Sequence, residues 1–411
     1  MSKVTRLAVA LGVGAGLLAS APVLAKKQVP AASGLTLSKP ERESLAELQA
    51  ALDARDYPRA TSALAAAQAA ARTAQTRYWV AGFQLRLGRE TNNARLQSSA
   101  VDAMIASGQV PQVELGNLYA TQAGFAAQSG DRKRLEASLA QAWELAPNAD
   151  TAISLAQIRF DQRRNADAIA LVERAIELRK QTGQPVPEAW YRRGINVAVA
   201  APLPASALRL GRDWIAAYPT RENWRDAILT YRDFGSPDAA ALVDATRLMR
   251  LAKALAGERD YLEAAQTFTN ARLPGESRSV LAEGVETRMI DPADPAKAKF
   301  KEAVATAGKA ATAGKAALPR LRSAAEAAAT GASALEAADQ YLSFGEYGPA
   351  ADLYRLAAQK GGVDPGVASL RLGIALALAG RGPEAQGAFQ AVTGPRAELA
   401  ALWLVWLGQR S

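Results

Sequence analysis

The stretch Gly345-Glu346-Tyr347-Gly348-Pro349-Ala350 shows the pattern of the fold, because it joins a tight turn to the start of a helix. Tyr354 and Ala357 follow Ala350 by four and seven residues, which places all three on one helical face. Asp364-Pro365 ends that helix, since the residue before a proline avoids the helical conformation. A second unit follows, and its small residue Ala385 lies 35 residues after Ala350. The pattern predicts a helical hairpin that repeats.

Segments upstream repeat the same turn and spacing. Asp56-Tyr57-Pro58-Arg59-Ala60 and Asp260-Tyr261-Leu262-Glu263-Ala264 both place a small residue at the start of an expected helix. Small or apolar residues recur at intervals of 33 or 34 residues, in the pairs Ala60 and Ala94, Leu135 and Ala168, and Ala207 and Ala240. Other intervals are 41, 39 and 24 residues, in the pairs Ala94 and Leu135, Ala168 and Ala207, and Ala240 and Ala264. We therefore expect a degenerate array with insertions and a shortened hairpin.

The composition agrees with a helical chain. Alanine dominates, and it is the best helix former because its side chain loses no rotamer entropy on ordering. The turn, the small residue and the spacing resemble the tetratricopeptide repeat (TPR), a helix-turn-helix of about 34 residues. The resemblance implies an all-α fold, a right-handed α-solenoid of degenerate TPR-like helical hairpins. The chain also resembles exported TPR proteins of Gram-negative bacteria that have no firm functional assignment.

The first 25 residues have the features of a secretory signal peptide. Lys3 and Arg6 form a basic start, residues 7–18 form a short apolar run, and Ala25 offers a cleavage site. We expect residues 1–25 to be removed and residues 26–39 to form a flexible linker, which predicts a soluble periplasmic protein. The alternative is a retained membrane anchor, although the run is shorter than the roughly 20 residues that cross a bilayer.

The rest of the chain divides by its repeat pattern. A TPR-like array is expected at 40–272, a non-repeat helical bridge rich in alanine and lysine at 273–334, and a C-terminal TPR pair with a capping helix at 335–411. Within the bridge, residues 292–322 carry a net charge of +5. They are either a basic tether for an anionic surface or a pair of simple helices between the arrays. In a helix, Phe300, Val304 and Ala307 share one face.

Two tryptophans characterise the last predicted helix, residues 397–408. Trp403 and Trp406 lie there with Leu399, Leu402 and Leu407. A repeat array needs a closing helix, because its last hairpin has no neighbour to cover its core. Capping is one interpretation, and a partner-docking patch is the other.

Catalytic chemistry finds little support in the sequence. The chain has no histidine and no cysteine, which removes the commonest general base, the commonest metal ligand, thiolate sites and disulfides. Glu43-Ser44 and Glu276-Ser277 lack the glycine-rich segment that follows the catalytic Glu-Ser of peptidoglycan-cleaving domains. No phosphate-binding loop or calcium loop occurs. We predict that the protein is not an enzyme, with no catalytic residue, no cofactor and no metal.

Binding is the predicted activity. In TPR arrays the first helix of each hairpin generally lines the concave groove, so the resemblance implies a partner groove at Trp79, Phe83, Arg86, Tyr191, Arg225, Leu229 and Arg232. Aromatic and arginine side chains suit an extended peptide. The alternative is that the aromatic residues belong to the core and the arginines to the solvated surface.

Two functions fit these features. The first is a periplasmic scaffold or adaptor that binds protein or peptide partners during envelope assembly. The second is a binder of peptidoglycan or another anionic envelope polymer, which the net charge of +9 would favour. Nucleic acid is not an expected partner, since the chain is predicted to be exported.

Overall fold

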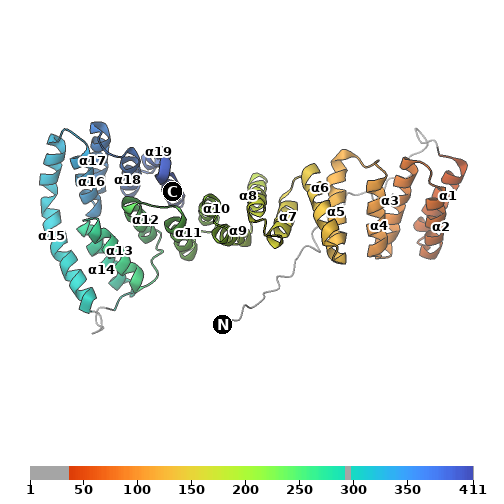
Figure 1. Cartoon of the computed structure of the whole chain (residues 1–411), viewed down its shortest axis with the longest axis horizontal. Helices are drawn as coiled ribbons and strands as arrows, with labels where there is room; N and C mark the ends of the chain where they lie inside the picture. The colour runs from red at the N-terminus through yellow and green to blue at the C-terminus, as the bar shows by residue number, and fades with distance from the viewer. Residues whose placement is uncertain (1–36, 292–297, 411) are drawn as a thin grey trace. The chain divides into compact units, whose positions relative to one another are not determined.

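The computed structural model describes residues 37–291 and 298–410, and within these ranges every regular element is a helix. The chain divides into two compact units, residues 1–185 and 186–411, which we call unit 1 and unit 2. Figure 1 labels their helices. The predicted all-α fold of TPR-like hairpins is confirmed. No described helix is long and apolar enough to span a membrane.

Unit 1 consists of successive helical hairpins. Each helix packs mainly against the helices that precede and follow it in the chain. The pairs are α1 (Lys39–Asp53) with α2 (Tyr57–Ala70), α3 (Ala74–Glu90) with α4 (Ala94–Ala106), α5 (Gln112–Ser129) with α6 (Arg132–Leu145), and α7 (Ala149–Asp161) with α8 (Asn165–Gln181).

One turn recurs inside these hairpins. A residue in the left-handed region ends the first helix of each pair, with positive φ at Arg55, Asn92, Gly130 and Arg163. In three of the pairs the next residue caps the second helix: Asp56, Asn93 and Asp131 accept backbone N–H groups at 3.0 to 3.1 Å. The same left-handed position occurs at Gly345 in the stretch that predicted the repeat.

Unit 2 contains the remaining helices. They are α9 (Glu188–Ala200), α10 (Pro204–Ala217), α11 (Arg221–Phe234), α12 (Ala239–Leu251), α13 (Glu258–Asn270), α14 (Pro274–Glu286), α15 (Ala298–Ala327), α16 (Ala332–Ser343), α17 (Tyr347–Lys360), α18 (Pro365–Leu378), α19 (Gly382–Gln390), the 3₁₀ turn η2 (Gly394–Arg396) and α20 (Ala397–Gly408).

Helix α12 lies at the centre of unit 2. Seven of its thirteen residues are buried, and it contacts α11, α13, α18 and α20. The chain closes on itself, because α20 also packs against α10. Gln409 Nε2 donates to the carbonyl oxygen of Ile215 at 2.8 Å, and Trp224 Nε1 donates to Gln409 Oε1 at 3.2 Å. Trp403 is fully buried and stacks on Phe389. Helix α20 therefore packs against both α19 and the early helices α10 and α12 of unit 2.

Helix α15 runs beside α14, α16 and α17 (Figure 1). Its inner face is formed by alanines and two leucines, with Ala307, Ala311, Leu318 and Ala325 buried and Leu321 half-buried. The predicted face was wrong at Val304, which is 39% exposed, because the buried row runs through Ala303 instead. The side chain of Phe300 lies outside the described residues.

The boundary between the units falls within the predicted 40–272 array, at a position where the repeat pattern indicated no division. The predicted bridge supplies α14 and α15 to unit 2, together with the C-terminal hairpins. The predicted signal peptide, residues 1–25, and nearly all of the predicted linker, residues 26–39, lie outside the described residues.

Candidate functional site

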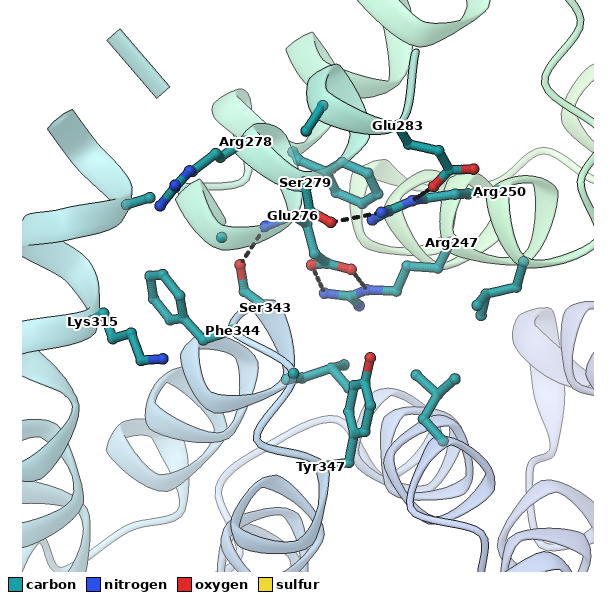
Figure 2. Close-up of a pocket in the computed structure, with 18 of the residues that line it drawn as sticks. Arg247, Arg250, Glu276, Arg278, Ser279, Glu283, Lys315, Ser343, Phe344 and Tyr347 are labelled. Carbon is teal, nitrogen blue, oxygen red and sulfur yellow. Dashed lines mark hydrogen bonds and ion pairs between the residues drawn. The ribbon is translucent and has the colours of Figure 1, made fainter. Parts of the chain in front are cut away.

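A cleft of about 790 Å³ lies inside unit 2 (Figure 2). Its walls come from α12, α14, α15 and the turn between α16 and α17, with one residue each from α13 and α18. The charged residues that line it are Arg247, Arg250, Lys253, Glu276, Arg278, Glu283 and Lys315, and the apolar or aromatic ones include Leu251, Leu342, Phe344, Tyr347 and Leu378.

Two glycines let these elements approach one another. A Cβ at Gly275, at the start of α14, would lie 2.3 Å from the carbonyl oxygen of Ser343. The close approach is fixed by a hydrogen bond of 3.0 Å from the backbone N–H of Glu276 to Ser343 Oγ. On α15, a Cβ at Gly314 would lie 3.0 Å from the ring of Phe344. Glycine at both positions therefore places the turn after α16 against α14 and α15.

The floor of the cleft is a buried ionic network. Arg247 is 3% exposed and donates to both carboxylate oxygens of Glu276, each at 2.7 Å. The same guanidinium donates to Asp244 at 2.5 Å, one turn earlier on α12. Asp244 also accepts from Arg371 of α18 at 3.1 Å. The network joins α12 and α14 to the C-terminal hairpins and gives the cleft a rigid floor.

Arg371 extends this network to α16 and α17. Its Nη1 donates to Asp339 at 2.7 Å, and the hydroxyl of Tyr354 donates to the other oxygen of Asp339 at 2.6 Å. Burial raises the pKa of Asp339, with Arg371 and Arg247 acting in the opposite direction. Burial also raises the pKa of Tyr354. Burial alone would lower the pKa of Arg371, but Asp244 and Asp339 outweigh it and raise the pKa above its usual value. The guanidinium therefore stays charged.

The rim of the cleft is more basic than its floor. Arg250 pairs with Glu283 at 2.6 Å, and Lys253 lies 3.6 Å from the same carboxylate. Arg278 forms no ion pair within the described part of the chain, and Lys315 Nζ is 4.0 Å from Glu346. Five cationic and two anionic side chains line the cleft, a net charge of +3.

Aromatic side chains complete the wall opposite α14. Figure 2 shows Phe344 and Tyr347 facing the side on which Arg247 and Glu276 lie. Burial, with a smaller contribution from Glu276, raises the pKa of Tyr347, so its hydroxyl remains a hydrogen-bond donor. The cleft therefore combines excess positive charge with an apolar wall and a phenolic donor, which suits an anionic ligand that has apolar parts.

The predicted groove residues of unit 1 lie together on α3. Trp79 is half-buried and meets Tyr78 edge to face, with ring centroids 6.2 Å apart. Phe83 packs against the core of the first hairpins. Arg86 pairs with Asp53 and Glu90, each at 2.8 Å. The guanidinium of Arg86 is therefore already neutralised within the unit.

The predicted residues of unit 2 lie in different environments. Tyr191 is fully buried against Tyr218, which corrects its placement in an accessible groove. Arg225 forms an ion pair with Asp260 of α13, and Leu229 packs against the core. Arg232 is exposed and lines a smaller cavity of about 270 Å³ between α11, α12 and α13. None of these four lines the cleft.

Sequence reasoning missed most of the cleft. Arg250, Arg278 and Phe344 had no motif to mark them, while Lys315 had only the basic composition of 292–322 and Tyr347 only its place in a turn. The network residues Asp244 and Arg371 lie 127 residues apart. No local spacing predicts such a pair, because the contact depends on how the helices close around α12.

Comparisons with solved structures find helical proteins. A chain in the structure of Naa15/Naa10 bound to HypK-THB is 14% identical, with 90% of this chain and 73% of that chain covered and a TM-score of 0.27. The P58(IPK) TPR domain is 13% identical over 83% of this chain and 98% of that one, with a TM-score of 0.21. A chain of the APC/C hetero-tetramer Cut9-Hcn1 is 12% identical over 90% and 84%, with a TM-score of 0.21.

These superpositions are poor over their length, so the fold class rests on the helices and contacts of this chain. No protein-family model matches the sequence. No curated protein matches it either.

Proposed function

We propose that the protein is a binding scaffold whose unit 2 cleft takes an acidic segment of a partner protein. The observation that carries the proposal is the pair of cations at the rim, Arg278 and Lys315, beside the apolar ring of Phe344. Arg278 forms no ion pair in the described ranges, and Lys315 has only the 4.0 Å pair with Glu346. An acidic segment with apolar side chains would supply both the missing charge and contacts for the ring.

The residues of the floor and those of the rim would contribute differently to binding. Arg247 is bound by Glu276 and Asp244, so it shapes the floor and has little capacity for a ligand. Arg278 and Lys315 would take carboxylates at one end, with Arg250 and Lys253 at the other. No chemical step is required of any group, and the lack of histidine and cysteine in the sequence supports a role in binding rather than catalysis.

Charge reversal at the rim tests this proposal. A labelled peptide of alternating glutamate and leucine should bind the protein, and its glutamine counterpart should bind much more weakly. The double variant R278E/K315E should lose about tenfold or more in affinity, measured by fluorescence anisotropy, because two charge-assisted contacts become repulsive. Moderate salt should weaken binding in the same direction.

The matched control is K309E/R320E, which makes the same change in net charge on exposed positions of α15 outside the cleft. Its affinity should stay close to that of the parent protein. Equal losses in both double variants would show a general charge effect and contradict the assignment to the cleft. Unchanged binding in R278E/K315E would contradict it directly.

We further propose that this scaffold acts in the periplasm, during envelope assembly. The support is the sequence of residues 1–25, with its basic start and short apolar run. Fractionation of cells that produce the full chain, with N-terminal sequencing of the product, tests the location. A product that starts at Lys26 in the periplasmic fraction is expected, and a full-length chain in the cytoplasm would contradict the proposal.

A second candidate function is binding of peptidoglycan or another anionic envelope polymer through α15. The exposed side of this helix carries Lys301, Lys309 and Arg320, which form no ion pair among the described residues. Co-sedimentation with purified cell wall should then fall in K301E/K309E/R320E and remain in R278E. The reverse result would favour the cleft as the site of binding.

A further inference from the structure

We propose that a groove in unit 1 binds an amphiphile with a single acyl chain and an anionic head, such as a fatty acid. The groove lies between α5, α6 and α7 and has a volume of about 790 Å³, within the range of small-molecule sites. It is separate from the unit 2 cleft, and the proposal does not depend on the function proposed for that cleft.

The walls of the groove are apolar along its length. Phe125, Leu135, Leu139 and Ile158 contribute the larger side chains, one or two from each helix. On α5, Gly124 faces open space, since a Cβ built there would meet nothing within 4 Å. Glycine at this position therefore keeps the groove open between larger residues. An extended hydrocarbon chain would contact all three helices and remove this apolar surface from water.

Apart from Gln128, the uncharged polar side chains along the groove are already hydrogen-bonded within the protein. Gln157 donates to Asp161 at 2.8 Å, and Gln162 donates to Glu136 at 2.7 Å. The hydroxyls of Thr121 and Ser154 donate to carbonyl oxygens of their own helices. An extended peptide would find few partners here for its backbone amides, and unpaired amides are costly. A hydrocarbon chain has no polar group to satisfy.

One end of the groove has unbalanced positive charge. Arg132 and Lys133 occupy the first turn of α6, and neither forms an ion pair in the part of unit 1 that the structure describes. Cations at a helix N-terminus are disfavoured by the helix dipole, so an anion there would relieve the repulsion. Of the two carboxylates that line the groove, Glu136 pairs with Arg159, while Asp161 accepts a hydrogen bond from the neutral amide of Gln157 and would repel an anionic head. The anionic head therefore belongs beside Arg132 and Lys133.

Titration with a fluorescent fatty acid, 11-(dansylamino)undecanoate, tests the proposal on the full chain. We expect saturable binding at one site in the groove and displacement of the probe by palmitate. Gly124→Leu should weaken binding at least about tenfold, because its side chain occupies the space of the acyl chain. R132E/K133E should weaken palmitate binding to a similar extent and leave binding of the uncharged alcohol hexadecanol nearly unchanged.

Two matched variants control for folding and charge. Gly82→Leu fills equally open space on α3, and R89E/R95E reverses two exposed charges of unit 1 outside the groove. Both should bind the probe like the parent protein. Absence of saturable binding would overturn the proposal, as would binding that Gly124→Leu leaves unchanged. Displacement of the groove-bound probe by an acidic amphipathic peptide but not by palmitate would also overturn it, because the ligand of the groove would then be a protein segment.

Discussion

Units 1 and 2 use the same hairpin but complete their cores in different ways. In unit 1 the buried side chains form separate clusters along the chain, and its longest side-chain contacts span about one hairpin, such as the 35 residues between Thr76 and Glu41. In unit 2 one continuous core extends from Ile215 to Trp406, and Gln409 bonds Ile215 across 194 residues. The difference teaches that one local pattern can form either a nearest-neighbour stack or a closed body.

The largest expected effect comes from removing residues 397–411, which include α20. Unit 2 should lose hydrogen-exchange protection as far back as α10 and α12, because both contact α20. Hydrogen exchange followed by mass spectrometry measures this helix by helix. Removing residues 37–56 from unit 1 is the comparison, and it should expose α2 and α3 while α5 to α8 stay protected. Loss of protection throughout unit 1 would remove the distinction between the units.

Substitution of Asp244 should have the next largest effect. Asp244 is fully buried between Arg247 and Arg371, so Asp244→Asn removes the carboxylate that the two guanidinium groups share and leaves Glu276 to pair with Arg247 and Asp339 to pair with Arg371. We expect a loss of about 3–5 kcal/mol in the unfolding free energy of unit 2, from urea denaturation. In unit 1, Asp102→Asn breaks a more exposed pair with Arg134 and should cost about 0–1 kcal/mol. Similar costs for both would contradict the comparison.

A smaller effect is expected at Arg225 and Arg232, two arginines of the predicted partner groove. Arg225 pairs with Asp260. Burial acts to raise the pKa of Asp260, but hydrogen bonds from Arg225 and from the backbone of Ala256 outweigh burial, and the net pKa is lowered. Arg225→Ala should therefore destabilise unit 2 by about 1 kcal/mol in urea denaturation. Arg232 is exposed and forms no ion pair in the described ranges, so Arg232→Ala should leave stability unchanged. Equal effects would show that the pair with Asp260 contributes nothing.

An effect confined to acid pH concerns Glu41 in unit 1. Hydrogen bonds from Ser38 and from the backbone of Arg72 lower the pKa of Glu41 from 4.5 to about 2. Because the folded pKa is the lower one, this carboxylate stabilises unit 1 fully above pH 4.5, and the contribution is lost as pH falls from 4.5 towards 2. Glu41→Gln should flatten that dependence in the hydrogen exchange of α1 and α3. Glu43→Gln, at an exposed position on α1, should keep the slope of the parent protein.

Several features of the fold could be predicted from particular residues. Gly345 indicated a turn because glycine tolerates the left-handed backbone that the structure has there. The stretch that begins at Asp56 indicated a helix start, and Asp56 caps the following helix. On α15, Val304 was expected on the same face as Ala307, but Ala307 is buried and Val304 is exposed, since alanines on adjacent positions give the hydrophobic pattern little contrast.

The candidate site was much harder to predict than the hairpins. Arg225 and Arg247 are both helical arginines one or two positions from apolar residues, yet Arg225 pairs with Asp260 on α13 and Arg247 lies under the cleft. The sequence does not distinguish Tyr191 from an exposed aromatic residue, but α9 places its side chain in the core. Aromatic and arginine residues occur in cores, ion pairs and binding sites alike, so residue type alone did not separate these roles.

By itself, the sequence determined the local structure: alanine-rich helices, their caps and the left-handed turns between them. These features depend on backbone conformation and on contacts a few residues apart. Only the tertiary structure decided that α20 returns to α10, that Asp244 meets Arg371, and that Arg278 and Lys315 share a cleft with Phe344. Such contacts join residues far apart in the chain, and they form only where whole helices pack with complementary shape and charge.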